Sequence, residues 1–108
     1  MALKRAVVVD RDPAVLGRLV TELGRQGFLA ETLDSAIGLT PDLLALGAPE
    51  LAVFDAELPG LDPRALATVV AALKAQLAID VVVTARNPDA ALRVTGADRA
   101  LARERLLA

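Results

Sequence analysis

The chain has 108 residues, of which 55% are hydrophobic and 24% charged, and its formal net charge is -2. This length suits one domain over residues 1–108, and no apolar run approaches the roughly 20 residues that span a bilayer. Because Cys and His are absent, disulfides, thiolate metal sites and a histidine base are excluded. The acidic balance and a mere two aromatic residues, both Phe, argue against nucleic-acid binding. No export signal is recognisable, so we expect a cytoplasmic protein without membrane attachment.

Short apolar runs rich in β-branched residues alternate with amphipathic stretches, which is typical of an α/β domain with a parallel sheet covered on both faces. The first predicted strand is 5–10. Asp12 is then a predicted helix cap and Pro13 the first helical residue, with a stop near Gly27. The apolar stripe of this helix would be Val15, Leu16, Leu19, Val20 and Leu23.

Two further strands are predicted in the middle of the chain, at 29–33 and at Leu51–Asp55. Between them the sequence indicates a short helix that is capped by Thr40, has Pro41 in its first turn, and faces Leu43, Leu44 and Leu46 inward. The third strand is a continuous apolar run that ends in a carboxylate, which is typical of a central strand that delivers a residue to the sheet edge.

The second half repeats the cap-plus-proline start at Asp62-Pro63 and Asn87-Pro88. A strand at 79–84 separates the two helices, and the later helix can extend only to about Gly96. The first of the two helices has the best apolar stripe in the sequence, formed by Leu66, Val69, Val70, Leu73 and Leu77.

The final segment combines conflicting preferences. Its Ala, Leu, Arg and Glu residues favour a helix, whereas the alternation of elements requires a fifth strand. We assign a short strand at 100–102 and expect the fifth helix to be missing or truncated.

Polar residues gather at the carboxyl ends of the predicted strands, where open α/β sheets bind their ligands. Each has a local explanation, since an Asp after a strand can cap a helix and Pro59-Gly60 can simply form a turn. Asp55 differs, because a carboxylate ending so apolar a strand is costly unless a cation or donors meet it. The residues concerned are Asp10, Arg11, Asp12, Asp55, Thr84 and Arg103.

Four segments together resemble the receiver domains of bacterial response regulators: VVVDRDP, FDAELPGLDP, VVTAR and GADRALAR, in this order along nearly the whole chain. The most specific is the aspartate followed four residues later by Pro-Gly and then by Asp62. The resemblance implies a flavodoxin-like, doubly wound sheet of five parallel strands in the order 2-1-3-4-5. It also implies a role in two-component signalling rather than catalysis.

The resemblance further implies a role for each matching residue. Asp55 would be the phosphoacceptor and Asp10 a member of the acidic pair. Asp10, Asp55 and the Glu57 backbone carbonyl would hold a divalent metal, commonly Mg²⁺. Thr84 would bind the phosphoryl oxygen with its hydroxyl, and Arg103 would take the place of the family lysine. Carboxylate, carbonyl and water oxygens are the ligands that Mg²⁺ prefers.

Several positions depart from the family pattern. Arg11 stands where the family has its second acidic metal ligand, and exchanging a negative for a positive charge there disfavours a cation by roughly several kcal/mol. Arg103 keeps the positive charge of the lysine but not its geometry, and Glu104 replaces the proline that usually follows. Ala100 stands in place of the aromatic switch residue. The sequence therefore makes Mg²⁺ binding doubtful.

Three functions stay open at this point. The leading hypothesis is an atypical receiver that acts as a protein-interaction module with impaired metal and phosphate switching. A working phosphoacceptor receiver that regulates an output partner is the second, and a small flavodoxin-like nucleotide- or flavin-binding enzyme is the third. The expected partner is a histidine kinase or an output domain, which could also follow residue 108 in a longer parent. We further expect homodimerisation or partner binding through the surface that a full fifth helix would cover.

Overall fold

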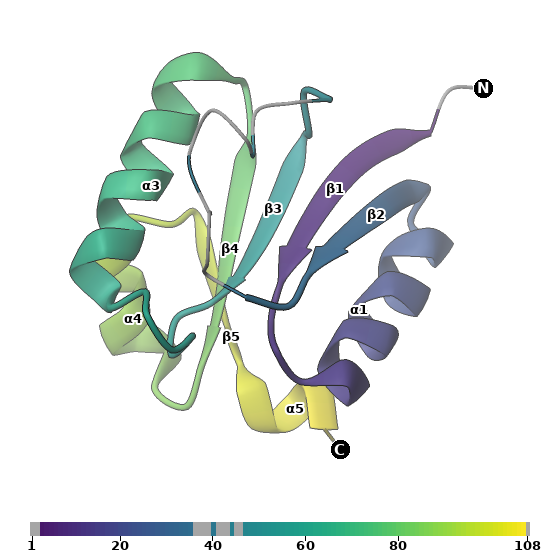
Figure 1. Cartoon of the computed structure of the whole chain (residues 1–108). Helices are drawn as coiled ribbons and strands as arrows, with labels where there is room; N and C mark the ends of the chain where they lie inside the picture. Colours follow the sequence, from purple (N-terminus) through teal and green to yellow (C-terminus); the bar gives the residue numbers. More distant parts are fainter. Residues whose placement is uncertain (1–2, 36–39, 41–43, 45–46, 108) are drawn as a thin grey trace.

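The fold is a parallel β-sheet between helices (Figure 1). The computed structural model describes residues 3–35, 40, 44 and 47–107. Its five strands lie in the order β2-β1-β3-β4-β5 and all neighbours are parallel, which confirms the expected topology. The strands are β1 (Lys4–Val9), β2 (Phe28–Leu33), β3 (Leu51–Asp55), β4 (Asp80–Ala85) and β5 (Arg99–Ala102); the helices are α1 (Pro13–Arg25), α3 (Pro63–Gln76), α4 (Pro88–Thr95) and α5 (Arg103–Leu107).

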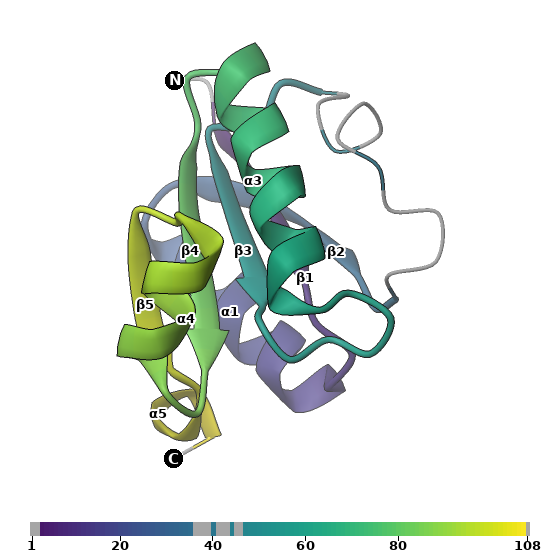
Figure 2. The ribbon, with the colours of Figure 1, turned by 90° about the vertical axis from the view of Figure 1, so that its left-hand side faces the viewer.

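Helices cover both faces of the sheet, as the doubly wound pattern requires. Figures 1 and 2 show α1 on one face and α3 and α4 on the other. The alternation along β1 explains the two layers, because Val7 and Val9 belong to the core under α3 whereas Ala6 and Val8 belong to the core under α1. Every residue of β3 is buried, as expected of a central strand.

Three helix starts follow the cap-plus-proline pattern that the sequence indicates. In each, a side-chain oxygen of the cap accepts a hydrogen bond from a backbone N–H of the first turn, and a proline occupies the first helical position. The pairs are Asp12 with Ala14 (2.9 Å), Asp62 with Ala65 (2.8 Å) and Asn87 with Ala90 (3.2 Å). α1 ends at Arg25, and Gly27 after it has a φ of 89°.

No end of a predicted strand differs from the observed end by more than one residue. Asp10 was placed in the first strand but follows it, although its N–H still donates to the Leu33 carbonyl (3.0 Å). Of the helix predicted after the second strand, Pro41, Leu43 and Leu46 lie outside the described residues. Leu44 is buried, as predicted, and its N–H donates to the Thr40 carbonyl (3.0 Å).

The apolar stripe of α1 is narrower than predicted. Val15, Leu19 and Leu23 are buried, but Val20 is 36% exposed, so its assignment to the inward stripe was wrong. Val15, Leu19 and Leu23 are spaced by four residues and therefore lie on one side of the helix, whereas Val20 lies at the edge of that side.

The C-terminal segment, in which helix and strand preferences conflict, forms a strand followed by a helix. Arg99–Ala102 forms the edge strand β5, and the next five residues form α5. α5 extends to Leu107, the last residue that the structure describes. Among those residues no helix is both long and apolar enough to cross a membrane.

Asp98 ties the start of β5 to its neighbours. Its carboxylate accepts hydrogen bonds from the Lys74 ammonium group (2.7 Å to each oxygen) and from the Val81 N–H (2.8 Å). The bond to Lys74, followed by that to Val81, lowers the pKa of Asp98 below its ordinary value. This anchor helps to position β5, and with it Arg103 at the end of that strand.

Replacing Asp98 with Asn is expected to destabilise the fold by about 1 kcal/mol at neutral pH, a modest loss because solvent screens the pair with Lys74. A lowered folded-state pKa means that the ionised group stabilises the fold above about pH 4 and that this contribution is lost as pH falls through the folded-state pKa. Urea unfolding of both proteins across pH 3 to 7 should therefore show a difference that shrinks in acid. A constant difference would contradict the role of the charge.

Candidate functional site

The carboxyl ends of the strands bring the candidate residues together at one edge of the sheet. Asp55 is the last residue of β3 and lies beside Thr84 of β4 in the sheet register. Asp10 directly follows β1, and Arg103 is the first residue of α5, directly after β5. Parallel strands all end at the same edge, so four separate parts of the chain meet there.

Asp10 and Arg103 form the closest ionic contact of the site. The Arg103 Nη1 and Nη2 atoms donate to the two Asp10 carboxylate oxygens at 2.6 and 2.9 Å, a bidentate pair. The side chain of Asp10 is 1% exposed and that of Arg103 is 17% exposed. The bonds to Asp10 raise the pKa of Arg103, so this guanidinium stays charged. Asp10 also accepts a bond from the Asp12 N–H (2.9 Å).

Arg103 reaches Asp55 as well. Its Nη1 atom lies 3.4 Å from an Asp55 oxygen, so a single nitrogen contacts both carboxylates. This confirms the expectation that a buried strand-end carboxylate needs a counter-charge. Burial raises the pKa of Asp55, while the hydrogen bond from the Glu57 N–H (2.8 Å) and the positive charge of Arg103 oppose this rise.

Thr84 has an unused hydroxyl group. The residue is fully buried, and its Oγ1 atom has no hydrogen-bond partner. A buried hydroxyl without a partner is costly and calls for an explanation, which can be a ligand that it meets at another stage. Thr84 lies next to Asp55 in the sheet register. Its role as a phosphoryl ligand stays a prediction.

A cavity of about 390 Å³ opens at this edge and is lined by Arg11, Asp12, Asp55, Glu57, Arg86 and Arg103, with Pro13 and Pro59. Arg11 and Glu57 are exposed, and the Glu57 carboxylate pairs with Arg86 (3.3 Å). Sequence reasoning assigned no role to Arg86. The sequence alone holds no signal for this pair, because Glu57 and Arg86 are brought together by the register that places Asp55 beside Thr84.

The arrangement does not fit a divalent cation as it stands. Within the described ranges, no cluster of three or more carboxylates is placed to hold an ion, and Arg103 already balances Asp10 and Asp55. A second cation near that guanidinium would be opposed by roughly several kcal/mol. The sequence indicates that Arg11 opposes Mg²⁺ binding. The structure shows that Arg103 does so as well, because it contacts both Asp10 and Asp55.

Comparisons with known structures agree with this architecture. The chain is similar to the signal receiver domain of a response regulator from Bermanella marisrubri (TM-score 0.71, 22% identity, 94% of this chain and 87% of that chain covered). It is also similar to a signal receiver domain of an HD domain-containing protein from Pseudomonas fluorescens Pf-5 (0.71, 19%, 95% and 84%). Full-length FixJ from B. japonicum matches over 99% of this chain but 55% of its own length (0.68, 25% identity). No protein-family model and no curated protein matches the sequence. The chain therefore has the receiver-domain fold.

Proposed function

We propose that this chain is an atypical receiver domain of two-component signalling, in which Arg103 takes the place of the metal beside Asp55. The observation that carries the proposal is the contact of one Arg103 nitrogen with both Asp10 and Asp55, at 2.6 and 3.4 Å. This contact supplies internally the positive charge that the carboxylates need. We assign no catalytic activity to the domain, which would act in the cytoplasm as a protein-interaction module over residues 1–108.

The proposed partner is a signalling protein, either a histidine kinase or an output domain. The receiver-domain fold supports this class of partner, and full-length FixJ extends well beyond the part that this chain matches. The acidic net charge supports the proposal that the domain by itself does not bind nucleic acid.

A working phosphoacceptor is the second candidate, and the buried, unpaired hydroxyl of Thr84 favours it. In that case Asp55 would be the nucleophile and Thr84 would donate a hydrogen bond to the incoming phosphoryl group. Arg103 would have to leave Asp55 for this group to enter. The charged lining of the cavity does not favour a flavin, which would need an apolar or aromatic surface.

Labelling of Asp55 separates the two candidates. We expect wild type to be labelled by acetyl phosphate at least roughly tenfold more slowly than a double variant, Arg11→Asp with Arg103→Lys, because the double variant restores an acidic ligand and a smaller cation. Intact-mass measurement of the phosphorylated fraction over time, with Mg²⁺ present, is the readout. Asp55→Asn is the control for labelling at other residues.

A magnesium titration by NMR completes this test. Arg11→Asp alone should bind Mg²⁺ more tightly than wild type, because a positive charge leaves the cavity and a ligand is gained. Equal affinities would mean that Arg11 does not oppose the ion. Rapid, complete labelling of wild-type Asp55 would overturn the atypical assignment and favour the second candidate.

A further inference from the structure

Asp10 and Asp55 receive the same support from the backbone but different support from Arg103. The Oδ1 atom of Asp10 accepts a hydrogen bond from the N–H two residues later, that of Asp12, at 2.9 Å. The Oδ1 atom of Asp55 likewise accepts from the Glu57 N–H, at 2.8 Å. Arg103 adds two hydrogen bonds to Asp10, at 2.6 and 2.9 Å, whereas its contact with the Asp55 Oδ2 atom is 3.4 Å long. The two carboxylates therefore differ chiefly in how Arg103 is shared between them.

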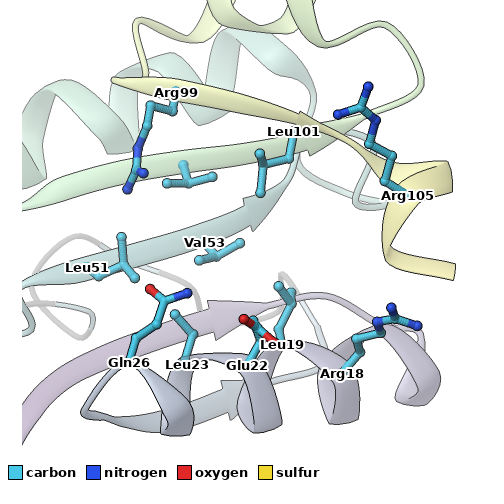
Figure 3. A pocket seen from close by; sticks show the side chains of 11 residues that line it. Arg18, Leu19, Glu22, Leu23, Gln26, Leu51, Val53, Arg99, Leu101 and Arg105 are labelled. Atoms are coloured by element: carbon cyan, nitrogen blue, oxygen red, sulfur yellow. The ribbon is translucent and has the colours of Figure 1, made fainter. Parts of the chain in front are cut away.

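The turn from β5 into α5 directs Arg103 to the strand ends. Leu101 before it and Arg105 after it line a groove of about 300 Å³ between this segment and α1 (Figure 3). Arg103 lines the strand-end cavity instead, together with Asp55. Because Arg103 follows directly after the edge strand β5, its side chain extends from a backbone position that the sheet fixes. The guanidinium thus lies where it contacts both carboxylates.

Asp55 and Asp10 differ in their access to the strand-end cavity. Asp55 lines this cavity of about 390 Å³, and Asp10 does not. In the part of the chain that the structure describes, no donor forms a hydrogen bond to the Asp55 Oδ2 atom, whose contact with Arg103 is ionic. A group that enters the cavity would therefore meet an oxygen of Asp55, and Asp10 can act on that group through Arg103.

The two carboxylates compete for one guanidinium group. The planar fork of an arginine matches a single carboxylate in the bidentate geometry, so its two best hydrogen bonds go to one partner. Arg103 is always charged and only 17% exposed, so it needs an anionic partner at this edge. If Asp10 lost its charge, the contact with Asp55 would remain. A movement of roughly 0.5 Å would then bring Arg103 from 3.4 Å into hydrogen-bond distance of Asp55.

We propose that Asp10 is a positioning residue, which holds Arg103 away from Asp55 and so keeps the Asp55 Oδ2 atom open to the cavity. The family resemblance implies that Asp10 is a metal ligand, whereas in this role Asp10 controls an internal cation. Loss of its charge would make Asp55 less reactive, because a hydrogen bond from the guanidinium must break before the oxygen can attack. This chemical consequence rests on the proposed function of the site, but the position of Arg103 does not.

Crystal structures of wild type and of Asp10→Asn test the position of Arg103 directly. In Asp10→Asn the shortest distance from Arg103 to Asp55 should fall from 3.4 Å to about 2.9 Å. Asp10→Ser, a second neutral variant, should show the same movement. Asp12→Asn is the matched control, because it removes a charge at the same edge while Asn still caps α1, and Arg103 should then stay on Asp10. Circular dichroism checks that each variant folds.

Labelling of Asp55 with acetyl phosphate in the presence of EDTA tests the chemical consequence. An Asp55 oxygen forms a bond to phosphorus, the bond between phosphorus and the acetyl oxygen breaks, and acetate leaves with the electron pair. Asp10→Asn should be labelled at least roughly tenfold more slowly than wild type. The direction is diagnostic, because removing a negative charge would by itself favour the approach of an anionic phosphodonor. EDTA excludes an effect through a lost metal ligand.

Two results would overturn the proposal. The first is an Arg103 that stays beyond about 3.3 Å from Asp55 in both neutral variants, or that turns to solvent. The second is labelling of Asp10→Asn in EDTA that equals or exceeds that of wild type. Absence of labelling in wild type concerns the proposed function alone, and the distance between Arg103 and Asp55 then decides.

Discussion

Replacing Arg103 with Met is expected to lower the free energy of unfolding by about 3–5 kcal/mol, the usual cost of leaving one member of a buried ion pair without its partner. The carboxylate of Asp10 is 1% exposed and receives both of its shortest side-chain contacts from Arg103. Met keeps much of the side-chain volume but supplies no charge. Urea unfolding at neutral pH measures the loss.

Two control variants identify the cause. Arg103→Lys should lose less than Arg103→Met, because it retains the positive charge although it cannot bind both oxygens through a planar fork. A double variant, Asp10→Asn with Arg103→Met, should recover part of the loss, because no unpaired charge remains. If Arg103→Met unfolds at the same urea concentration as wild type, Arg103 does not supply the counter-charge of this edge.

Replacing Phe54 with Ala is expected to destabilise the fold by about 3–5 kcal/mol, the range for removing a buried aromatic ring from a core. Phe54 is fully buried in β3 and lies between Val9 and Val83 in the sheet register. It immediately precedes Asp55, so loss of its packing should also loosen the strand end that holds this carboxylate. Thermal and urea unfolding measure the first effect, and NMR shifts around Asp55 report the second.

Phe28→Ala is the matched control, because Phe28 is the other aromatic residue of the chain. It is partly buried in the edge strand β2, with the Lys4 ammonium group 5.8 Å from the ring centroid. A loss of about 1 kcal/mol is expected there. Equal losses for the two variants would mean that β3 is no more tightly packed than the sheet edge.

Much of the candidate site can be predicted from the sequence, because its residues lie at predicted strand ends. Asp10, Asp55, Thr84 and Arg103 do meet at one edge, as parallel topology requires. Arg86 was missed, since its partner Glu57 is 29 positions away in the chain and the two are neighbours only through the register of β3 with β4. The predicted roles of these residues in phosphorylation and metal binding remain for the labelling and titration experiments.

Local sequence patterns predict the alternation of strands and helices, the capped helix starts and the position of Asp55 at the end of β3, because these features depend on hydrophobic periodicity and on contacts a few residues apart. The cation that contacts the carboxylates depends on the three-dimensional arrangement of the strands. Arg11 adjoins Asp10 in the chain, but it is exposed at the cavity, whereas Arg103, 93 residues away, binds Asp10 directly. Arg11 lies in the bend between β1 and α1, where its side chain is exposed, whereas the carboxylate of Asp10 is buried. The return of β5 to the same edge brings the distant arginine in.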